Sequence, residues 1–253
     1  MRRPDPSVAT RPPVRIVGDP LRVDGPFVFT CEHASNRLIG VEATPGDRAL
    51  LDDHWGWDKG IAPVTEALAR DLGCVAVLSD FSRLLVDPNR AINSPTLIVE
   101  RCGDVPVSFN QGLAPAEIRH RIETLYAPYH GAVDRICRAR LARGPAHLVS
   151  MHSYTADFLG QRRTMEVGVL FDAFESEARA LGAALKAEGF VVALNEPYSG
   201  KAGAFTYSIM KHGLAHGVPF VELEVRNDLI ETAAQQADVA ARIGRALKVF
   251  APG

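Results

Sequence analysis

The feature that most constrains this chain is the alternation of short apolar runs with longer amphipathic segments. Runs typical of buried strands occupy residues 27–31, 74–78, 146–151, 166–171, 190–194 and 219–225. Helical patterns occupy residues 59–72, 115–143, 175–188 and 230–250. This alternation predicts the α/β class, with a mixed, mainly parallel central sheet covered by helices on both faces.

Two local signals refine this prediction. Pro128 interrupts the longest helical pattern, where we expect a kink or a break, because proline lacks the backbone N–H that a helix needs. Residues 1–20 contain four arginines and five prolines and no apolar run, which is typical of a loose N-terminal tail rather than a signal peptide. We therefore predict a flexible tail over residues 1–20 and a single domain over residues 21–253.

Charge and cysteine content exclude several classes of partner. The net charge is −2 and no apolar stretch is long enough to cross a membrane, so nothing favours nucleic acid or a membrane as partner. None of the four cysteines belongs to a Cys-x-x-Cys pair, so we expect buried thiols in a reducing, cytoplasmic compartment. Oligomeric state stays open.

Polar side chains gather where the predicted strands end. His33 follows the first apolar run, His152 follows the third, and the last run carries Glu222 and Glu224. Ligands of open α/β sheets bind at the carboxyl ends of the strands. Two histidines with nearby carboxylates predict a zinc site that keeps one coordination position for water.

Six segments, in order, resemble the motif series of the N-formylglutamate amidohydrolase family. They are EHASN (32–36), HWGWDKG (54–60), SRLLVDPNR (82–90), MHSYT (151–155), NEPYSG (195–200) and VELEVRNDL (221–229). That family is similar in fold to the zinc exopeptidases and aspartoacylase-type deacylases. The resemblance therefore implies a zinc-exopeptidase (phosphorylase/hydrolase)-like fold.

The resemblance also implies roles for particular residues. His33 and His152 would hold one zinc ion, Asn89 and Arg90 would bind a substrate carboxylate, and Glu224 would be the catalytic glutamate. The chain departs from the deacylase pattern at Asn36, which stands where a third metal ligand, glutamate, is expected.

The third metal ligand must then come from another residue. Our first candidate is Asp58, which could equally be a helix N-cap before residues 59–72. The alternatives are Asp53, His54, Glu32 and Asn36 itself.

Further residues complete the predicted site. Arg83 or Arg90 would stabilise charge at the carbonyl, and Arg83, Arg163 and Tyr198 are further candidates for substrate binding. Glu222 lies on the same strand face as Glu224 and is expected to pair with Arg226 or another basic group.

His212 and His216 have the spacing of a zincin motif, but the sequence HGLAH lacks its glutamate, so we interpret the pair as structural. Two glycines, Gly213 and Gly217, also weaken a helix at this position.

Together these features predict a metal-dependent amidohydrolase that cleaves N-formyl-L-glutamate, or a close N-acyl amino acid, to formate and glutamate. Two alternatives remain open. One is a deacylase or carboxypeptidase-like hydrolase for another N-acyl amino acid or short peptide. The other is a non-catalytic protein that binds an acidic metabolite.

Overall fold

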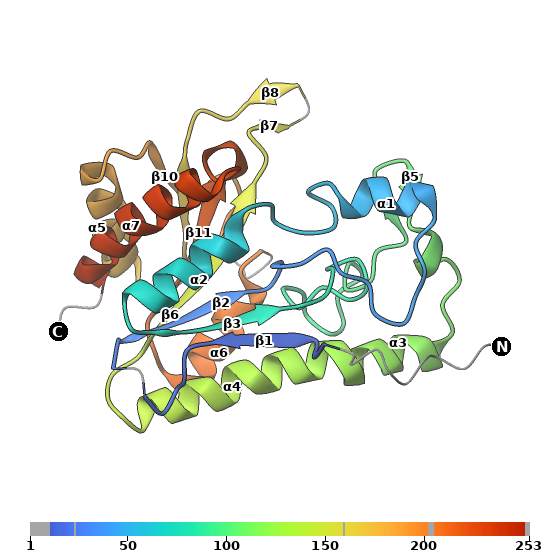
Figure 1. Cartoon of the computed structure of the whole chain (residues 1–253), viewed down its shortest axis with the longest axis horizontal. Coiled ribbons are helices and arrows are strands. Elements are labelled where there is room, and N and C mark those ends of the chain that lie inside the picture. The colour runs from blue at the N-terminus through green and yellow to red at the C-terminus, as the bar shows by residue number, and fades with distance from the viewer. Residues whose placement is uncertain (1–10, 23, 159, 202–204, 251–253) are drawn as a thin grey trace.

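The computed structural model describes residues 11–22, 24–158, 160–201 and 205–250 (Figure 1). At its centre is a seven-stranded sheet in the order β1-β3-β2-β6-β11-β9-β10. The strands are β1 (Val14–Val17), β2 (Phe27–Cys31), β3 (Val75–Ser79), β6 (His147–Tyr154), β9 (Val167–Leu170), β10 (Val192–Leu194) and β11 (Phe220–Arg226). Strands β3, β2, β6 and β11 are mutually parallel, whereas β1 is antiparallel to β3 and β9 to β11. The predicted mixed, mainly parallel sheet is confirmed.

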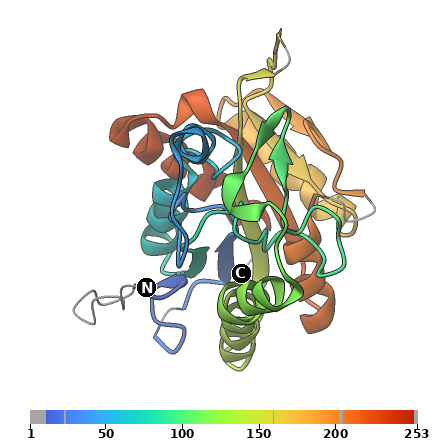
Figure 2. The same ribbon diagram turned by 90° about the vertical axis from the view of Figure 1, so that its right-hand side faces the viewer.

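Helices cover both faces of the sheet, as predicted (Figures 1 and 2). On one face lie α2 (Ile61–Asp71), α5 (Glu175–Ala187) and α7 (Ala233–Phe250), and on the other lie α4 (Ala127–Leu141) and α6 (Tyr207–His216). Strand β3 supplies both cores in alternation, with Ala76 and Leu78 in the first and Val75 and Val77 in the second.

The long predicted helix is interrupted at the place that Pro128 indicates. It begins as α3 (Pro115–Arg121), passes through a π-helical turn (Ile122–Tyr126) and continues as α4, with Pro128 in its first turn. The π-helical turn ends just before Pro128, where the missing proline N–H breaks the regular hydrogen-bond ladder of the helix. All four cysteines are buried and free, as expected.

Besides short hairpin strands and 3-10 turns, strand β1 and two helices were not predicted. Residues 1–10 of the predicted tail lie outside the described residues. Val14–Val17 forms β1 and pairs with β3, so the tail prediction is corrected for these four residues. Helix α1 (Pro45–Leu51) was missed, and so was α6. Gly213 belongs in α6 because a β-carbon there would lie 2.1 Å from the Phe220 ring on β11.

The carboxyl ends of the four parallel strands meet at one edge of the sheet. Two hairpins border this edge, β4 (Arg101–Cys102) with β5 (Val105–Pro106) and β7 (Asp157–Phe158) with β8 (Gln161–Arg162), and Figure 2 looks onto it. Within the described ranges, no helix is long and apolar enough to span a bilayer.

Candidate functional site

On the sheet face covered by α4 and α6, the last inward positions of three parallel strands are polar. These positions are Thr30 and Glu32 at the end of β2, Ser150 and His152 on β6, and Glu222 and Glu224 on β11. The strand register sets Ser150 between Thr30 and Glu222, and His152 beside Glu224. Alternating positions of the same strands stay apolar and fill the other core. The sheet therefore concentrates buried titratable groups at one edge.

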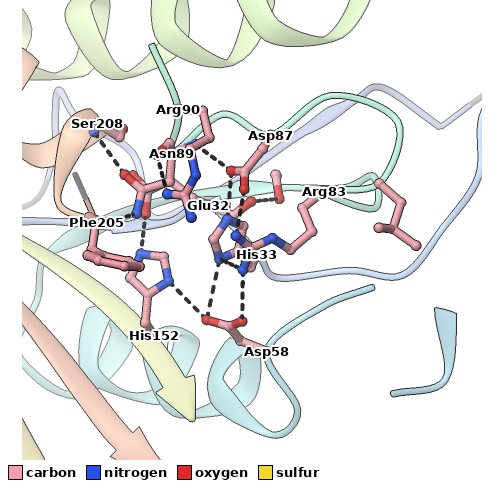
Figure 3. A network of polar contacts seen from close by, with 12 residues as sticks. Glu32, His33, Asp58, Arg83, Asp87, Asn89, Arg90, His152, Phe205 and Ser208 are labelled. Atoms are coloured by element: carbon pink, nitrogen blue, oxygen red, sulfur yellow. Dashed lines mark hydrogen bonds and ion pairs between the residues drawn. The ribbon is translucent and has the colours of Figure 1, made fainter. Parts of the chain in front are cut away.

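His33, Asp58 and His152 form a compact cluster at this edge (Figure 3). Their ligand atoms all lie within 4.8 Å of one another, and all three residues are buried. Nδ1 of His152 is 2.9 Å from Oδ2 of Asp58, and Nδ1 of His33 is 3.5 Å from the same oxygen. Two imidazoles and a carboxylate are a donor set that zinc accepts, so these residues could hold a metal ion.

A second layer of carboxylates orients both imidazoles. Nε2 of His33 lies 2.8 Å from Asp87 Oδ1, and Nε2 of His152 lies 3.2 Å from Glu32 Oε2. Each ring thus turns Nδ1 toward Asp58 and Nε2 toward another carboxylate. The Nε2 of His33 forms a hydrogen bond with Asp87, which is how metal-binding histidines are oriented, whereas the Nε2 of His152 makes only an ion-pair contact with Glu32.

The orienting carboxylates stay ionised. Burial opposes the charge of Glu32, but the contact with His152 and the hydrogen bond from Ser150 lower its pKa, and Tyr129 donates to its other oxygen at 2.9 Å. Burial likewise opposes ionisation of Asp87, whose pKa the Arg83 charge holds well below its usual value. Both groups therefore remain acceptors at neutral pH.

Glu222 and Glu224 behave in the opposite way. Burial raises the pKa of Glu222 to about 8 and holds the pKa of Glu224 well above its usual value. Among the described residues, Oε2 of each finds no hydrogen-bond partner. Arg226 pairs with Asp228 rather than with Glu222, so the first partner predicted for Glu222 is corrected. In the described part of the chain, the basic side chain within ion-pair distance of Glu222 is His152, at 3.7 Å.

Asp58 joins the cluster and does not cap a helix. The residue at the N-cap of α2 is Gly60, and the backbone N–H of Asp58 donates to the His33 carbonyl at 2.9 Å. That backbone bond brings the carboxylate against both imidazoles.

The alternative third ligands are not part of this cluster, although His54 also lines the cavity described below. Asn36 contacts Asp52, and Asp53 and His54 contact each other at 3.2 Å. Glu32 lies behind the second histidine, on its Nε2 side.

A cavity of about 330 Å³ opens beside the cluster. His33, Asp58, His152 and Glu224 line its floor, and its walls include five aromatic side chains, Trp55, Tyr154, Phe158, Tyr198 and Phe205. This volume is at the lower end of the range for small-molecule sites.

Arg83, Arg90 and Arg101 also line the cavity. Nη2 of Arg83 lies 2.6 Å from Asp87, and its Nη1 lies 3.2 Å from Nδ1 of His33. The positive charge of Arg83 is therefore engaged with residues of the cluster and its surroundings. The Arg90 guanidinium lies 5.6 Å from the centre of the Phe205 ring. Two of these residues, Arg83 and Arg90, were predicted.

Arg163 and Asn89 are placed differently from the expectation. Arg163 is not among the described residues that line the cavity, and its guanidinium packs 4.6 Å from the Phe158 ring centre. The Asn89 amide is already engaged, since Nδ2 donates to the Phe205 carbonyl at 2.6 Å and Oδ1 accepts from the Ser208 N–H at 2.9 Å. Asn89 therefore holds the Phe205 loop and the start of α6 in place, although it borders the cavity.

Sequence reasoning missed Asp87, Trp55, Arg101 and Phe205. Asp87 lies inside a motif that was singled out, four residues after the arginine that it pairs with, and this spacing was a usable signal. Trp55 also lies inside one of the quoted motifs, HWGWDKG (54–60). Arg101 and Phe205 had no such signal, because their loops come to the cavity only through the fold.

A mixed α/β sheet that buries two histidines and a carboxylate at its parallel edge, beside a small-molecule cavity, defines a protein with a candidate metal centre. The model of the N-formylglutamate amidohydrolase family matches residues 25–231, so the chain belongs to that family.

Three individual proteins are similar to this chain. The chain is 30% identical over 142 residues to an N-formylglutamate deformylase of Pseudomonas putida, and the match spans 51% of each protein, about half the length of that relative. A solved gene product of Agrobacterium tumefaciens is 30% identical, with a TM-score of 0.83 over 94% of this chain and 96% of that one. An N-formylglutamate amidohydrolase of Ralstonia eutropha shares the fold, with 19% identity and a TM-score of 0.73 over 94% and 98%.

Proposed function

We propose that the chain hydrolyses the amide bond of N-formyl-L-glutamate, with one zinc ion held by His33, Asp58 and His152. The observation that carries this proposal is the arrangement of the two imidazoles. Both turn Nδ1 toward Asp58 while their Nε2 atoms face the carboxylates of Asp87 and Glu32. The family membership supports the reaction class and the substrate.

When bound, the zinc ion supplies positive charge that makes water a stronger nucleophile and stabilises negative charge on the formyl oxygen. Glu224 lines the cavity with an unpartnered carboxylate oxygen. A cation held by the adjacent cluster would lower the raised pKa of Glu224 and favour the ionised carboxylate that a general base requires. It takes a proton from water as the oxygen attacks the formyl carbon, and returns it to the amine nitrogen as the C–N bond breaks. The products are formate and glutamate.

Arginines on the cavity wall would bind the two carboxylates of the substrate. Arg90 and Arg101 both line the cavity, and an arginine side chain matches a carboxylate with two parallel hydrogen bonds. Arg83 supports the cluster through Asp87 and places its charge 4.0 Å from Asp58.

The test is formate release from N-formyl-L-glutamate by purified protein, before chelation, after chelation and after zinc is restored. We expect activity that is lost to the chelator and recovered with zinc. Formate release that survives complete metal removal would contradict the metal-dependent mechanism.

The aromatic walls favour a second candidate, an N-acyl amino acid with a larger or more apolar side chain. Five rings border the cavity, and neither carboxylate of glutamate needs them. A panel of N-formyl amino acids discriminates between the candidates. A higher kcat/KM for N-formylphenylalanine or N-formylleucine than for N-formylglutamate would select the second.

A further inference from the structure

A second cluster of metal-binding side chains lies between α4 and α6, and none of its members lines the cavity. Its members are Asp134 on α4 with His212 and His216 on α6. Oδ1 of Asp134 is 2.9 Å from Nδ1 of His212 and 3.0 Å from Nε2 of His216. Two helices that are distant in sequence thus converge on one carboxylate oxygen.

The spacing of the donors suits a tetrahedral ion. Zinc bonds of about 2.0–2.1 Å at tetrahedral angles set neighbouring donor atoms about 3.3 Å apart. The two distances from Asp134 Oδ1 are a few tenths of an ångström shorter, and all three donor atoms lie within 4.8 Å of one another, so small side-chain movements would admit an ion. Histidines four residues apart share a helix face, which is the spacing that helical zinc sites use.

His212, the buried histidine of the cluster, is also contacted by a third histidine, His130. Nε2 of His212 lies 2.8 Å from Nδ1 of His130, whose ring packs 4.3 Å from that of Tyr126. When His212 donates from Nε2 to His130, its Nδ1 carries no proton and is available as a ligand. The side chain of His212 is fully buried, so its ring keeps this orientation.

The cluster also has an open side. The side chain of Asp134 is 36% exposed and that of His216 is 10% exposed, so solvent can reach the carboxylate. A structural zinc site has four ligands, and water from this side can supply the fourth. The missing glutamate of HGLAH excludes zincin catalysis but does not affect ligation.

We propose that Asp134, His212 and His216 bind a second divalent transition-metal ion of the zinc type, which joins α4 to α6. Its role is structural. Because the first turn of α6 is tied to Asn89 at the cavity, the ion would also steady the wall that carries Phe205.

The test uses the full chain with the substitutions His33→Ala and His152→Ala, which remove two proposed ligands of the cavity cluster. After chelator treatment and desalting, this variant is titrated with zinc, and bound metal and thermal unfolding are measured. We expect a single equivalent of bound zinc and a rise in the unfolding temperature. Adding His216→Ala should abolish both, whereas adding His120→Ala, at an exposed position on α3, should change neither.

Zinc binding that persists after His216→Ala, or no zinc binding in the parent variant, would overturn the proposal. The latter result would mean that Asp134 only accepts hydrogen bonds from two imidazoles. If the parent variant does not fold, the wild-type chain is compared with its His216→Ala variant. We expect two equivalents of bound zinc in the wild type and one in the variant, and equal zinc contents would overturn the proposal. The readout does not depend on formate release, so it is separate from the test of the proposed function.

Discussion

Glu224 combines burial, a raised pKa and a carboxylate oxygen without a hydrogen-bond partner among the described residues. A buried acidic group without a partner costs free energy, and such groups concentrate where chemistry needs them. We expect Glu224→Gln to lower kcat for formate release by roughly two to four orders of magnitude, because glutamine cannot accept the proton. Zinc content should be unchanged. Glu231→Gln, at an exposed position, is the matched control, and near-normal turnover of the Glu224 variant would remove this residue from the role.

Asp47 gives a prediction about pH. It accepts hydrogen bonds from the backbone N–H groups of Thr44 and Ser108, each at 2.8 Å, and so joins the start of α1 to the Ser108 turn. Burial opposes its ionisation, but the hydrogen bonds of Ser108 and Thr44 lower its pKa below 3.8. A lowered carboxyl pKa contributes stability above the unfolded-state value, and this contribution disappears as the pH falls through the folded-state value.

We therefore expect Asp47→Asn to lower the free energy of unfolding at pH 7 by about 1–3 kcal/mol, the scale of hydrogen bonds to a charged group. The difference from wild type should shrink as the pH falls below 3.8. Urea unfolding at several pH values measures it, with the exposed Asp104→Asn as control. A difference that stays constant with pH would exclude the ionised carboxylate as its source.

Single residues of the site differed in how well the sequence revealed them. His33, His152 and Glu224 could be predicted because strand ends and motif order both pointed to them. Asp87 and Glu32 contact the histidines, and those contacts join residues that lie far apart in the sequence. Asn89 looked like a ligand-binding residue, but its partners, Phe205 and Ser208, are more than a hundred residues away in sequence.

At the scale of elements, α6 shows how packing overrides helix propensity. Gly213 lies where a β-carbon would meet the Phe220 ring at 2.1 Å, whereas Gly131 in α4 has no such neighbour within 4 Å. Gly213→Ala should therefore destabilise the protein by about 1–3 kcal/mol through overpacking. Gly131→Ala should stabilise it by about 0.5–1 kcal/mol, because alanine is the better helix former. Thermal unfolding of both variants tests the contrast, and equal effects of the two substitutions would contradict the packing argument.

The same reasoning explains which elements the sequence revealed. Buried strands and long amphipathic helices were predicted within a few residues, because their periodicity is local. Helix α6 was missed because Gly213 and Gly217 lower helix propensity, and only the sheet shows why glycine is needed at the first position. Strand β1 was missed because its four residues lie among arginines and prolines, and its pairing with β3 is set by tertiary structure.

For the whole molecule, a bound ion couples the site to global stability. A ligand that binds only the folded state raises the free energy of unfolding by about 2.7 kcal/mol at one hundred times its Kd. We expect zinc to stabilise the wild-type chain against urea by an amount on this scale for each site occupied. The His152→Ala variant should lose the part of this stabilisation that comes from zinc bound at the cavity cluster. Identical urea curves in chelator and in zinc would contradict a folded-state metal site.

Trp55 lines the cavity, and the second of the two tryptophans in the chain, Trp57, lies two residues away beside Asp58. All of the intrinsic tryptophan emission therefore originates in the segment that contributes a cluster residue and part of the cavity wall. A change in that emission when a substrate or an ion enters would report occupancy directly. The native chain thus carries its own optical probe, and binding could be followed in real time without a label or a coupled assay.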